Sequence, residues 1–286
     1  MEISLLTWNI WFDEVERENR TRKIMEICQC LDPDFIAFQE VTGEAMKCIN
    51  KYKGQYKLID DKLKQRYDTI ILSKHNCVYR ERIPLPRSEM GRNLLRGYFY
   101  LESRGGGVDG VDGNSGSGCV RREINVGTFH LESVFKKNEI KLKEDQMKFI
   151  YDNSPSSCIL MGDTNFGNNE RLGEWAGAVG GVGAVGGVGG VGVGVGVGGD
   201  SRLVDIFERI GEPIAYKNTY TGKTNPFVNR RLNSRLDRIY TKNMNYRVKS
   251  FQLVGNEMEH FFYHEGVNEY APPSDHYGVY CTIKID

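Results

Sequence analysis

The run Cys158-Ile159-Leu160-Met161-Gly162-Asp163-Thr164-Asn165 is the part of this sequence that decides the fold. Its apolar first half is bounded by turn-forming residues, which predicts a buried strand. This strand delivers the carboxylate of Asp163 and the amide of Asn165 to the loop at its end. Such a pair can orient a water molecule and hold a phosphate oxygen. Asp and Asn also begin turns for purely local reasons, so the stretch alone leaves both interpretations open.

Four other stretches repeat this arrangement, in which an apolar run adjoins polar, titratable residues. They are the strand-like runs that end at Asn9, at Gln39-Glu40 and at His130, and the triplet Ser274-Asp275-His276 before a strand-like C-terminal run. A sheet can bring such strand ends together around one ligand. Taken singly, Asn9 indicates a turn, Glu40 a solvated helix start and His276 a surface imidazole. The five stretches together favour a shared site.

Charge and composition exclude several classes of protein. Lys plus Arg number 38 and Asp plus Glu also number 38, so no overall positive field attracts nucleic acid and any DNA contact needs a local basic patch. No apolar run approaches the roughly 20 residues that span a bilayer. The N-terminus enters a strand directly, without a signal peptide, so we expect a protein that is neither secreted nor bound to a membrane.

The 7 cysteines show neither metal-ligand spacing nor a disulfide framework. This pattern favours reduced thiols and a compartment such as the nucleus or cytosol. Because the motifs span the whole length, we expect a single domain over residues 1–286 rather than two smaller ones. Apolar residues at helical spacing predict helices over residues 18–31 and 137–152, and composition supports a mixed α/β domain.

Two glycine-rich segments interrupt this pattern. Residues 104–118 lie between strand-like runs and predict a hairpin with a lengthened connection. Residues 176–199 are almost entirely Gly and Val, with too few large side chains to offset the entropy of ordering. The second segment has no fingerprint of a phosphate-binding loop. We interpret both segments as surface insertions, which cost little because closure entropy grows slowly with loop length.

The order of the motifs resembles that of the endonuclease/exonuclease/phosphatase superfamily of metal-dependent phosphoesterases. The stretches that carry this resemblance are Thr7-Trp8-Asn9, Gln39-Glu40, Gly162-Asp163-Thr164-Asn165 and Ser274-Asp275-His276. The resemblance extends from Leu5 to Ile283, apart from the two inserts. It implies an α+β fold in which two facing sheets form a central sandwich and helices cover the outside, giving four layers.

Further stretches are similar to the 5′-tyrosyl-DNA phosphodiesterase family within this superfamily. They are Met90-Gly91-Arg92-Asn93-Leu94-Leu95, His130-Leu131-Glu132-Ser133, Asp163-Thr164-Asn165-Phe166 and Leu236-Asp237-Arg238-Ile239-Tyr240. This resemblance implies a Mg²⁺-dependent hydrolase that removes trapped topoisomerase 2 from DNA 5′ ends, with RNA–tyrosyl bonds as a second substrate. It implies repair in the nucleus, with the cytoplasm as a second location, and we expect a monomer.

The same resemblance implies roles for individual residues. Glu40 would be the main ligand of Mg²⁺, or of Mn²⁺ in its place, because hard cations take oxygen ligands, and Asp275 would join the metal shell. Asn9 would hold a phosphate oxygen or a metal-bound water. Asp163 would orient and deprotonate the attacking water, and Asn165 would fix a nonbridging oxygen or that water.

His276 would donate to the phosphate and stabilise its developing charge, and Asp237 would orient the imidazole. His130 and Ser133 would add donors near the phosphate. Arg92 is a candidate phosphate contact, as is Arg96. Tyr220 would stack on a terminal base, as Phe227 could. Each aromatic or arginine also has an ordinary structural interpretation, as a packed or a solvated side chain.

The chain departs from its apparent relatives at two positions. Trp11 stands where they carry Asp after the Trp-Asn-Ile stretch, and Asp13, two residues further on, would not place its carboxylate equivalently. Gly167 stands where they carry a basic residue, so one phosphate or DNA-backbone contact would be missing or supplied elsewhere, with Arg171 as the candidate.

Three other functions stay open from the sequence. Two are enzymatic: an abasic-site endonuclease or another nuclease of the superfamily, and a phosphatase of inositol lipids or sphingomyelin. The third is a catalytically inactive scaffold. The sequence argues against the lipid phosphatase because it has no membrane-binding amphipathic stretch. It argues against a scaffold because a scaffold has no need of an intact Glu40, Asp163 and His276.

Overall fold

The computed structural model describes residues 1–103, 120–133, 139–167, 202–257, 259–264 and 267–286. Both glycine-rich segments, 104–118 and 176–199, lie outside the described residues, as does Arg171.

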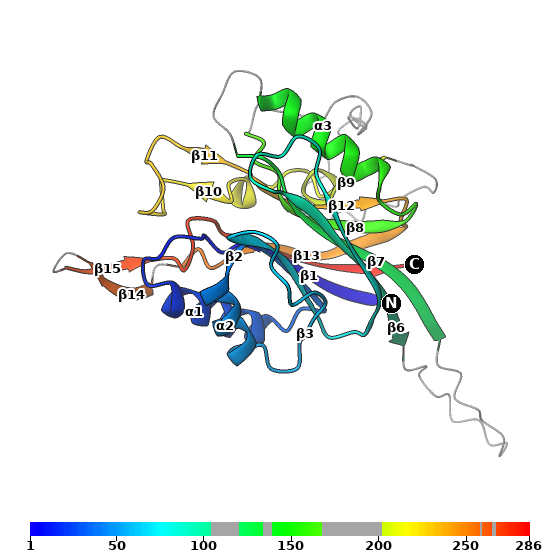
Figure 1. Ribbon diagram of the computed structural model, residues 1–286, viewed down its shortest axis with the longest axis horizontal. Helices are drawn as coiled ribbons and strands as arrows, with labels where there is room; N and C mark the ends of the chain where they lie inside the picture. Colours follow the sequence, from blue (N-terminus) through cyan, green and yellow to red (C-terminus); the bar gives the residue numbers. More distant parts are fainter. Residues whose placement is uncertain (104–119, 134–138, 168–201, 258, 265–266) are drawn as a thin grey trace, which may run out of the picture.

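The chain forms two six-stranded mixed sheets that lie face to face (Figure 1). The first contains, in spatial order, β13 (Tyr246–Val254), β16 (Gly278–Ile285), β1 (Glu2–Asn9), β2 (Phe35–Thr42), β4 (Tyr67–Ser73) and β3 (Lys57–Leu58). The second contains β5 (Cys77–Pro84), β6 (Asn93–Ser103), β7 (Val120–His130), β8 (Cys158–Asp163), β12 (Asp237–Lys242) and β9 (Leu203–Asp205). Two short ribbons accompany them, β10 (Tyr220–Thr221) with β11 (Asn233–Ser234), and β14 (Glu259–His264) with β15 (Val267–Ala271).

Helices cover the two outer faces of this sandwich. On the outside of the first sheet lie α1 (Arg17–Leu31) and α2 (Gly43–Tyr52), and on the outside of the second lies α3 (Glu139–Asp152). The short α4 (Ile206–Arg209) and the 3₁₀-helix η2 (Ile214–Tyr216) follow β9. The predicted two-sheet sandwich flanked by helices is therefore confirmed, in four layers (Figure 1).

Both faces of each sheet are buried, which explains why the central strands are apolar almost throughout. Successive side chains of a strand point to opposite faces. Leu5 therefore joins the core between the sheets, and Leu6 joins the core beneath α1 and α2. In β8, Ile159 packs between the sheets while Leu160 packs under α3.

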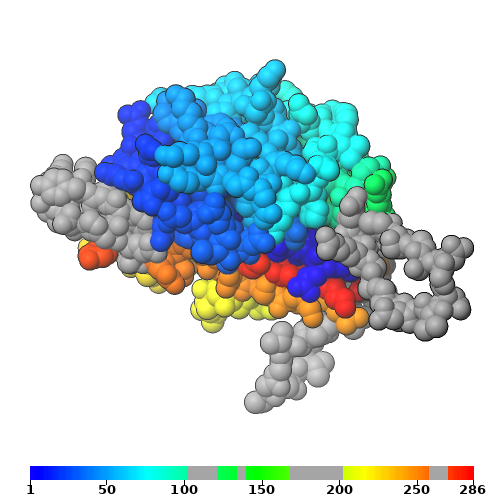
Figure 2. Space-filling model, turned by 90° about the horizontal axis from the view of Figure 1, so that it is seen from below, coloured from blue at the N-terminus to red at the C-terminus, as the bar shows by residue number. Residues whose placement is uncertain are grey.

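Two parallel strand pairs position the strand ends. The strands β1 and β2 are parallel and joined through α1, and β7 and β8 are parallel and joined through α3. Their registers place Asn9 opposite Gln39 and His130 opposite Asp163. In the antiparallel partner of β8, Asp237 lies opposite Asp163. The first and last strands pair as well, so the blue N-terminal and red C-terminal segments lie side by side in Figure 2.

Several predicted elements are confirmed, with changes at their ends. The hairpin around residues 104–118 is made by the antiparallel pair β6 and β7. The predicted helix over 137–152 is described from Glu139. The strand predicted to end at Gln39-Glu40 instead continues to Thr42, with a register irregularity between Phe38 and Val41. That prediction was wrong because a bulge accommodates one extra residue of β2 between Phe38 and Val41, and the pairing with β4 resumes beyond it.

Candidate active site

The ends of the strands from both sheets meet at one buried cluster. Its members are Asn9 at the end of β1, Glu40 in the bulge of β2, His130 at the end of β7, Asp163 at the end of β8, Asp237 at the start of β12 and His276 just before β16. The side chain of Glu40 is 12% exposed, against 2% for His130 and 1% for Asp163. Of these three side chains, that of Glu40 is the most exposed to solvent.

Asp163 lies at the centre of the cluster. Its Oδ2 accepts a hydrogen bond from Nδ2 of Asn9 at 2.9 Å and lies 3.4 Å from Nε2 of His130. Its Oδ1 accepts from the backbone N–H of Asn165 at 2.8 Å. Burial opposes ionisation of Asp163, but the neighbouring imidazoles and these hydrogen bonds hold its pKa below the usual value. The carboxylate is therefore ionised at neutral pH and able to accept a proton.

The protonation of His130 follows from its neighbours. Burial and the Arg92 guanidinium hold the pKa of His130 well below its usual value, so the imidazole is neutral. Arg92 can only donate, and its Nη1 lies 2.7 Å from Nδ1 of His130. The proton of His130 must then sit on Nε2, the nitrogen that faces Asp163. Arg92 thereby selects the tautomer that donates toward the central carboxylate.

His276 is positively charged, in contrast to the neutral His130. Its Nδ1 lies 2.8 Å from Oδ2 of Asp237, and its Nε2 lies 3.9 Å from Oδ2 of Asp163. Burial opposes the charged imidazole, but the carboxylates of Asp237 and Asp275 outweigh it and hold the pKa of His276 well above the usual value. An imidazolium held between carboxylates can donate to an anionic ligand, as the sequence predicted for His276.

Glu40 and Asp275 are two further carboxylates, and their negative charge is less balanced by neighbouring groups than that of Asp163. Oε2 of Glu40 accepts from the backbone N–H of Phe12 at 3.0 Å, and burial raises the pKa of Glu40. Burial and the nearby Glu40 carboxylate raise the pKa of Asp275 to about 7. Burial raises the pKa of both carboxylates, and a divalent cation would supply the positive charge that stabilises their ionised forms.

A different trio, Asp163, Asp237 and His276, places one possible ligand atom each within 4.8 Å of the others. We favour Glu40 and Asp275 as the cation ligands, because Nδ1 of His276 is already used on Asp237 and the imidazolium itself neutralises the trio.

Three residues of the site have left-handed backbone conformations, which non-glycine residues rarely adopt. They are Trp11 with φ 62°, Glu40 with φ 60° and Asn165 with φ 49°. Hydrogen bonds hold each of them: the N–H of Trp11 donates to Oδ1 of Asn9, the N–H of Asn165 donates to Asp163, and Oε2 of Glu40 accepts from the N–H of Phe12. Strain of this kind concentrates at functional sites, where surrounding contacts stabilise it.

Other predicted residues border the cluster. The ring of Tyr220 lies 4.9 Å from the imidazole of His276, and Phe227 packs 4.6 Å from Trp11. The hydroxyl of Ser133 donates to the sulfur of Met90 at 3.2 Å. The side-chain amide of Asn165 donates to the carbonyl of Leu131, so it anchors the loop after β8.

One predicted phosphate contact, Arg96, lies away from the cluster, and Asp13 does not join it either. Arg96 pairs with Glu81 on β5 and donates to the backbone carbonyl of Asn153 just after α3, so its assignment as a phosphate contact was wrong. No local signal distinguishes Arg96 from Arg92, because their partners are distant in sequence. Asp13 accepts from the N–H of Val15 in a local turn, which agrees with the expectation that it does not replace the carboxylate missing at position 11.

Sequence reasoning missed two residues that hold the site together. The buried guanidinium of Arg20 donates to the carbonyls of Ile10 at 3.1 Å and Pro273 at 3.2 Å, which ties the end of β1 to the segment before Asp275. Thr219 accepts from the N–H of Asp237 at 3.1 Å. Arg20 lies within a helix, where an arginine is normally solvated, so the sequence carried no signal for this role.

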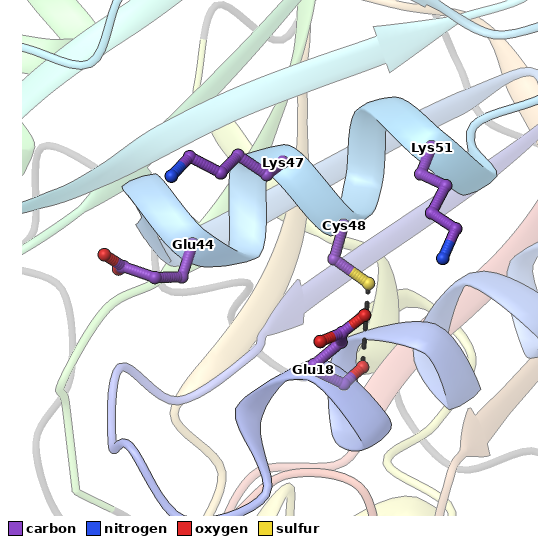
Figure 3. A pocket seen from close by; sticks show the side chains of 5 residues that line it. All are labelled: Glu18, Glu44, Lys47, Cys48 and Lys51. Carbon is purple, nitrogen blue, oxygen red and sulfur yellow. Dashed lines mark hydrogen bonds between the residues drawn. The ribbon is translucent and has the colours of Figure 1, made fainter.

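A cavity of about 350 Å³ lies away from the cluster, between α1 and α2. Figure 3 shows Glu44, Lys47, Cys48 and Lys51 on α2 facing Glu18 on α1, with the Cys48 thiol directed at the Glu18 carbonyl. Its lining carries two acidic and two basic side chains, and none of its lining residues belongs to the strand-end cluster. It is therefore not the candidate site. No helix within the described residues has the length and apolarity to span a membrane.

Known proteins share sequence and fold with this chain. A sequence model of the Endonuclease/Exonuclease/phosphatase family matches residues 6–276. Among curated proteins, the chain is similar to tyrosyl-DNA phosphodiesterase 2 of Xenopus laevis, with 27% identity over 99% of this chain and 66% of that protein. Its similarity to the Bos taurus protein of that name is 26% over 99% of this chain and 68% of the relative. The chain thus spans about two thirds of the length of these relatives.

Solved structures share the fold at lower identity. D. rerio TDP2 complexed with single strand DNA product has a TM-score of 0.70 and 21% identity, and the match covers 99% of each chain. The mannosyl-6-phosphatase of Bacteroides thetaiotaomicron has a TM-score of 0.63 and 15% identity, with 99% of each chain covered. At these identities the likeness concerns the fold alone, which serves more than one phosphoester substrate.

Proposed function

The chain belongs to the endonuclease/exonuclease/phosphatase family, and on this premise we propose that it is a metal-dependent phosphodiesterase that hydrolyses 5′-phosphotyrosyl bonds of DNA. Family membership confirms the predicted superfamily and the predicted enzyme class, a hydrolase of phosphoric esters. The observation that carries the proposal is the contact of Asn9, His130 and His276 with the single carboxylate of Asp163. The tyrosyl-DNA substrate is supported by the similarity to the two tyrosyl-DNA phosphodiesterase 2 sequences.

The residues divide the chemical work as follows. Asp163, ionised and held by Asn9 and Asn165, orients the attacking water and accepts its proton. His130 keeps Asp163 in place by pointing Nε2–H at it. His276, held as a cation by Asp237, donates to a nonbridging oxygen and stabilises the additional negative charge of the pentacovalent phosphorus.

Glu40 and Asp275 would hold Mg²⁺, with Mn²⁺ as a substitute of similar coordination. When bound, the ion neutralises phosphate charge and so makes the phosphorus more accessible to a nucleophile. Since Trp11 stands where the family resemblance implies Asp, Glu40 and Asp275 would hold the ion with more help from water. Tyr220 beside His276 and Phe227 beside Trp11 offer aromatic faces for the terminal base.

The proposal extends to the biological setting. The products are a 5′-phosphate DNA end and the tyrosine of a trapped topoisomerase 2, with RNA–tyrosyl bonds as a second substrate. We place the activity in the nucleus, with the cytoplasm as a second location, in a monomeric chain whose residues 1–286 form one domain.

A direct substrate comparison tests the proposal. Purified protein is offered a 5′-tyrosyl oligonucleotide, an abasic-site duplex and an inositol polyphosphate, each with Mg²⁺ or with a chelator. We expect the tyrosyl oligonucleotide to have the highest kcat/KM and the chelator to abolish turnover. Preference for the abasic duplex or the inositol phosphate would reject the substrate assignment. Absence of turnover on all three would favour a scaffold.

A further inference from the structure

The segment between β5 and β6 carries Arg92 into the site, and one buried carboxylate holds this segment. Glu132 is only 1% exposed. Its Oε2 accepts from the hydroxyl of Ser88 at 2.6 Å, and its Oε1 accepts from the backbone N–H groups of Met90 at 2.9 Å and Glu89 at 3.1 Å. All three donors belong to the same turn of residues 88–90. The carboxylate therefore fixes the path of the chain just before Arg92.

Glu132 is itself held from α3. Its backbone N–H donates to Oε1 of Gln146 at 3.0 Å, and Nε2 of Gln146 lies 3.5 Å from Oε2 of Glu132. The same Nε2 lies 3.3 Å from the carbonyl of Pro86, at the beginning of the segment. Gln146 is fully buried. The pair Glu132 and Gln146 thus connects the segment to the helix that packs on the second sheet.

The segment in turn fixes Arg92. The hydroxyl of Ser88, while donating to Glu132, accepts from the backbone N–H of Arg92 at 2.8 Å. The guanidinium of Arg92 then reaches Nδ1 of His130 at 2.7 Å, and Nε2 of His130 faces Asp163. A chain of short contacts therefore runs from Glu132 to the central carboxylate of Asp163.

We propose that Glu132 is a positioning residue for the reaction. It holds residues 88–90 so that Arg92 keeps His130 in the orientation that supports Asp163. This inference rests on the proposed phosphodiesterase function. Its chemical basis is that Ser88, Glu89 and Met90 all present hydrogen-bond donors, which a carboxylate can satisfy together. A glutamine of the same shape would turn an NH₂ group toward a donor, so Glu132→Gln disturbs the contacts without changing the volume.

The first test is a double-mutant cycle between Glu132→Gln and Arg92→Ala, assayed on the 5′-tyrosyl oligonucleotide with Mg²⁺. Loss of a partner that orients a site residue typically costs 10- to 100-fold. We expect Glu132→Gln to lower kcat about tenfold with KM changed less than about twofold. In the Arg92→Ala background we expect the same substitution to change kcat less than about twofold, because the connection is already broken.

Asp34→Asn is the matched control. The Asp34 carboxylate also accepts from a serine hydroxyl and a backbone N–H, both of Ser4, but at the opposite end of β1 and β2. We expect Asp34→Asn to leave kcat unchanged in both backgrounds. If Glu132→Gln does not fold, Ser88→Ala removes only the hydroxyl between Glu132 and Arg92, and the same cycle is run with it. A full tenfold loss that persists in the Arg92→Ala background would overturn the proposal.

Hydrogen exchange provides a readout that needs no activity. We expect the backbone amides of residues 88–92 to exchange at least about tenfold faster in Glu132→Gln than in the wild type, and unchanged in Asp34→Asn. Unchanged exchange in Glu132→Gln would also overturn the proposal. If the wild-type protein does not cleave the tyrosyl oligonucleotide, the proposed function fails, while the exchange experiment still decides whether Glu132 holds this segment.

Discussion

Replacing Asp163 by Asn keeps the shape of the central side chain and removes its charge. Every group around Oδ2 of Asp163 is a donor: Nδ2 of Asn9 at 2.9 Å, Nε2 of His130 at 3.4 Å and Nε2 of His276 at 3.9 Å. The other oxygen accepts from a backbone N–H at 2.8 Å. Whichever way the new amide turns, its NH₂ group faces a donor.

The expected costs to stability and to catalysis differ. One mispaired buried donor costs about 1–3 kcal/mol, which is less than the roughly 5–15 kcal/mol of a typical native state, so the variant folds. Loss of a general base lowers turnover by about 10²–10⁴, equivalent to about 3–5 kcal/mol in the barrier. Asp163→Asn should therefore lose activity by orders of magnitude while its unfolding midpoint falls by only a few degrees.

The assay measures initial rates on the 5′-tyrosyl oligonucleotide with Mg²⁺, together with thermal unfolding of the same preparation. Asp34→Asn serves as the control because its carboxylate is also hydrogen-bonded but lies at the far end of the strands. If Asp163→Asn retains more than about a tenth of wild-type turnover, another residue activates the water and the reasoning is refuted.

Three further predictions concern stability. Burial opposes ionisation of Asp34, but its hydrogen bonds with His75 and Ser4 outweigh burial and lower its pKa. Its contribution to stability is therefore present above the unfolded pKa of about 4 and is lost as pH falls through the folded value. The difference in unfolding free energy between wild type and Asp34→Asn should shrink in urea titrations below about pH 4, and a constant difference would contradict this. Mg²⁺ at 100 times its Kd should stabilise the folded protein by about 2.7 kcal/mol, which is measured as a rise in the thermal midpoint. Glu40→Gln should lose most of this rise, and an equal rise in the variant would mean that the ion binds elsewhere. A methyl group at Gly162 would lie 2.0 Å from the carbonyl oxygen of Phe129. Gly162→Ala should therefore lower the unfolding free energy in urea by about 1–3 kcal/mol or more. Gly43→Ala is the control, since a methyl group there meets nothing within 4 Å, and equal effects of the two substitutions would refute the packing argument.

Short-range patterns in the sequence predict the individual strands and the polar residues at their ends, whereas the two-sheet sandwich was implied by the resemblance of the motif order to a known family. An apolar run followed by Asp or Asn is visible within a few residues, as at Asp163 and Asn9. The parallel pairing of β1 with β2 and of β7 with β8 then brings such ends to one edge without further information. Membership of the cluster therefore follows from strand order.

The orientation of each side chain depends on contacts that have no local pattern. Glu40 reaches the site because a bulge turns its backbone to φ 60°, and periodicity alone predicted a simple strand end there. Arg92 and Arg96 are four residues apart, yet one reaches His130 and the other reaches Glu81 and the end of α3. Burial of an arginine is decided by its distant acceptors, so composition could not separate the two.

Trp11 stands where the family resemblance implies Asp, and it contacts a cation and an aromatic ring. Its ring lies between the guanidinium of Arg20, at 4.6 Å, and the ring of Phe227, also at 4.6 Å. The same guanidinium bonds the carbonyls of Ile10 and Pro273, on either side of the site. Where relatives would have a carboxylate, this chain therefore has an aromatic ring stacked on a buried cation. Oδ1 of Asp275 accepts a hydrogen bond from the Ser274 hydroxyl at 3.3 Å. Burial raises the pKa of Asp275 to about 7 although the Arg20 cation opposes this, so a divalent ion that binds there must displace a proton from part of the molecules at neutral pH.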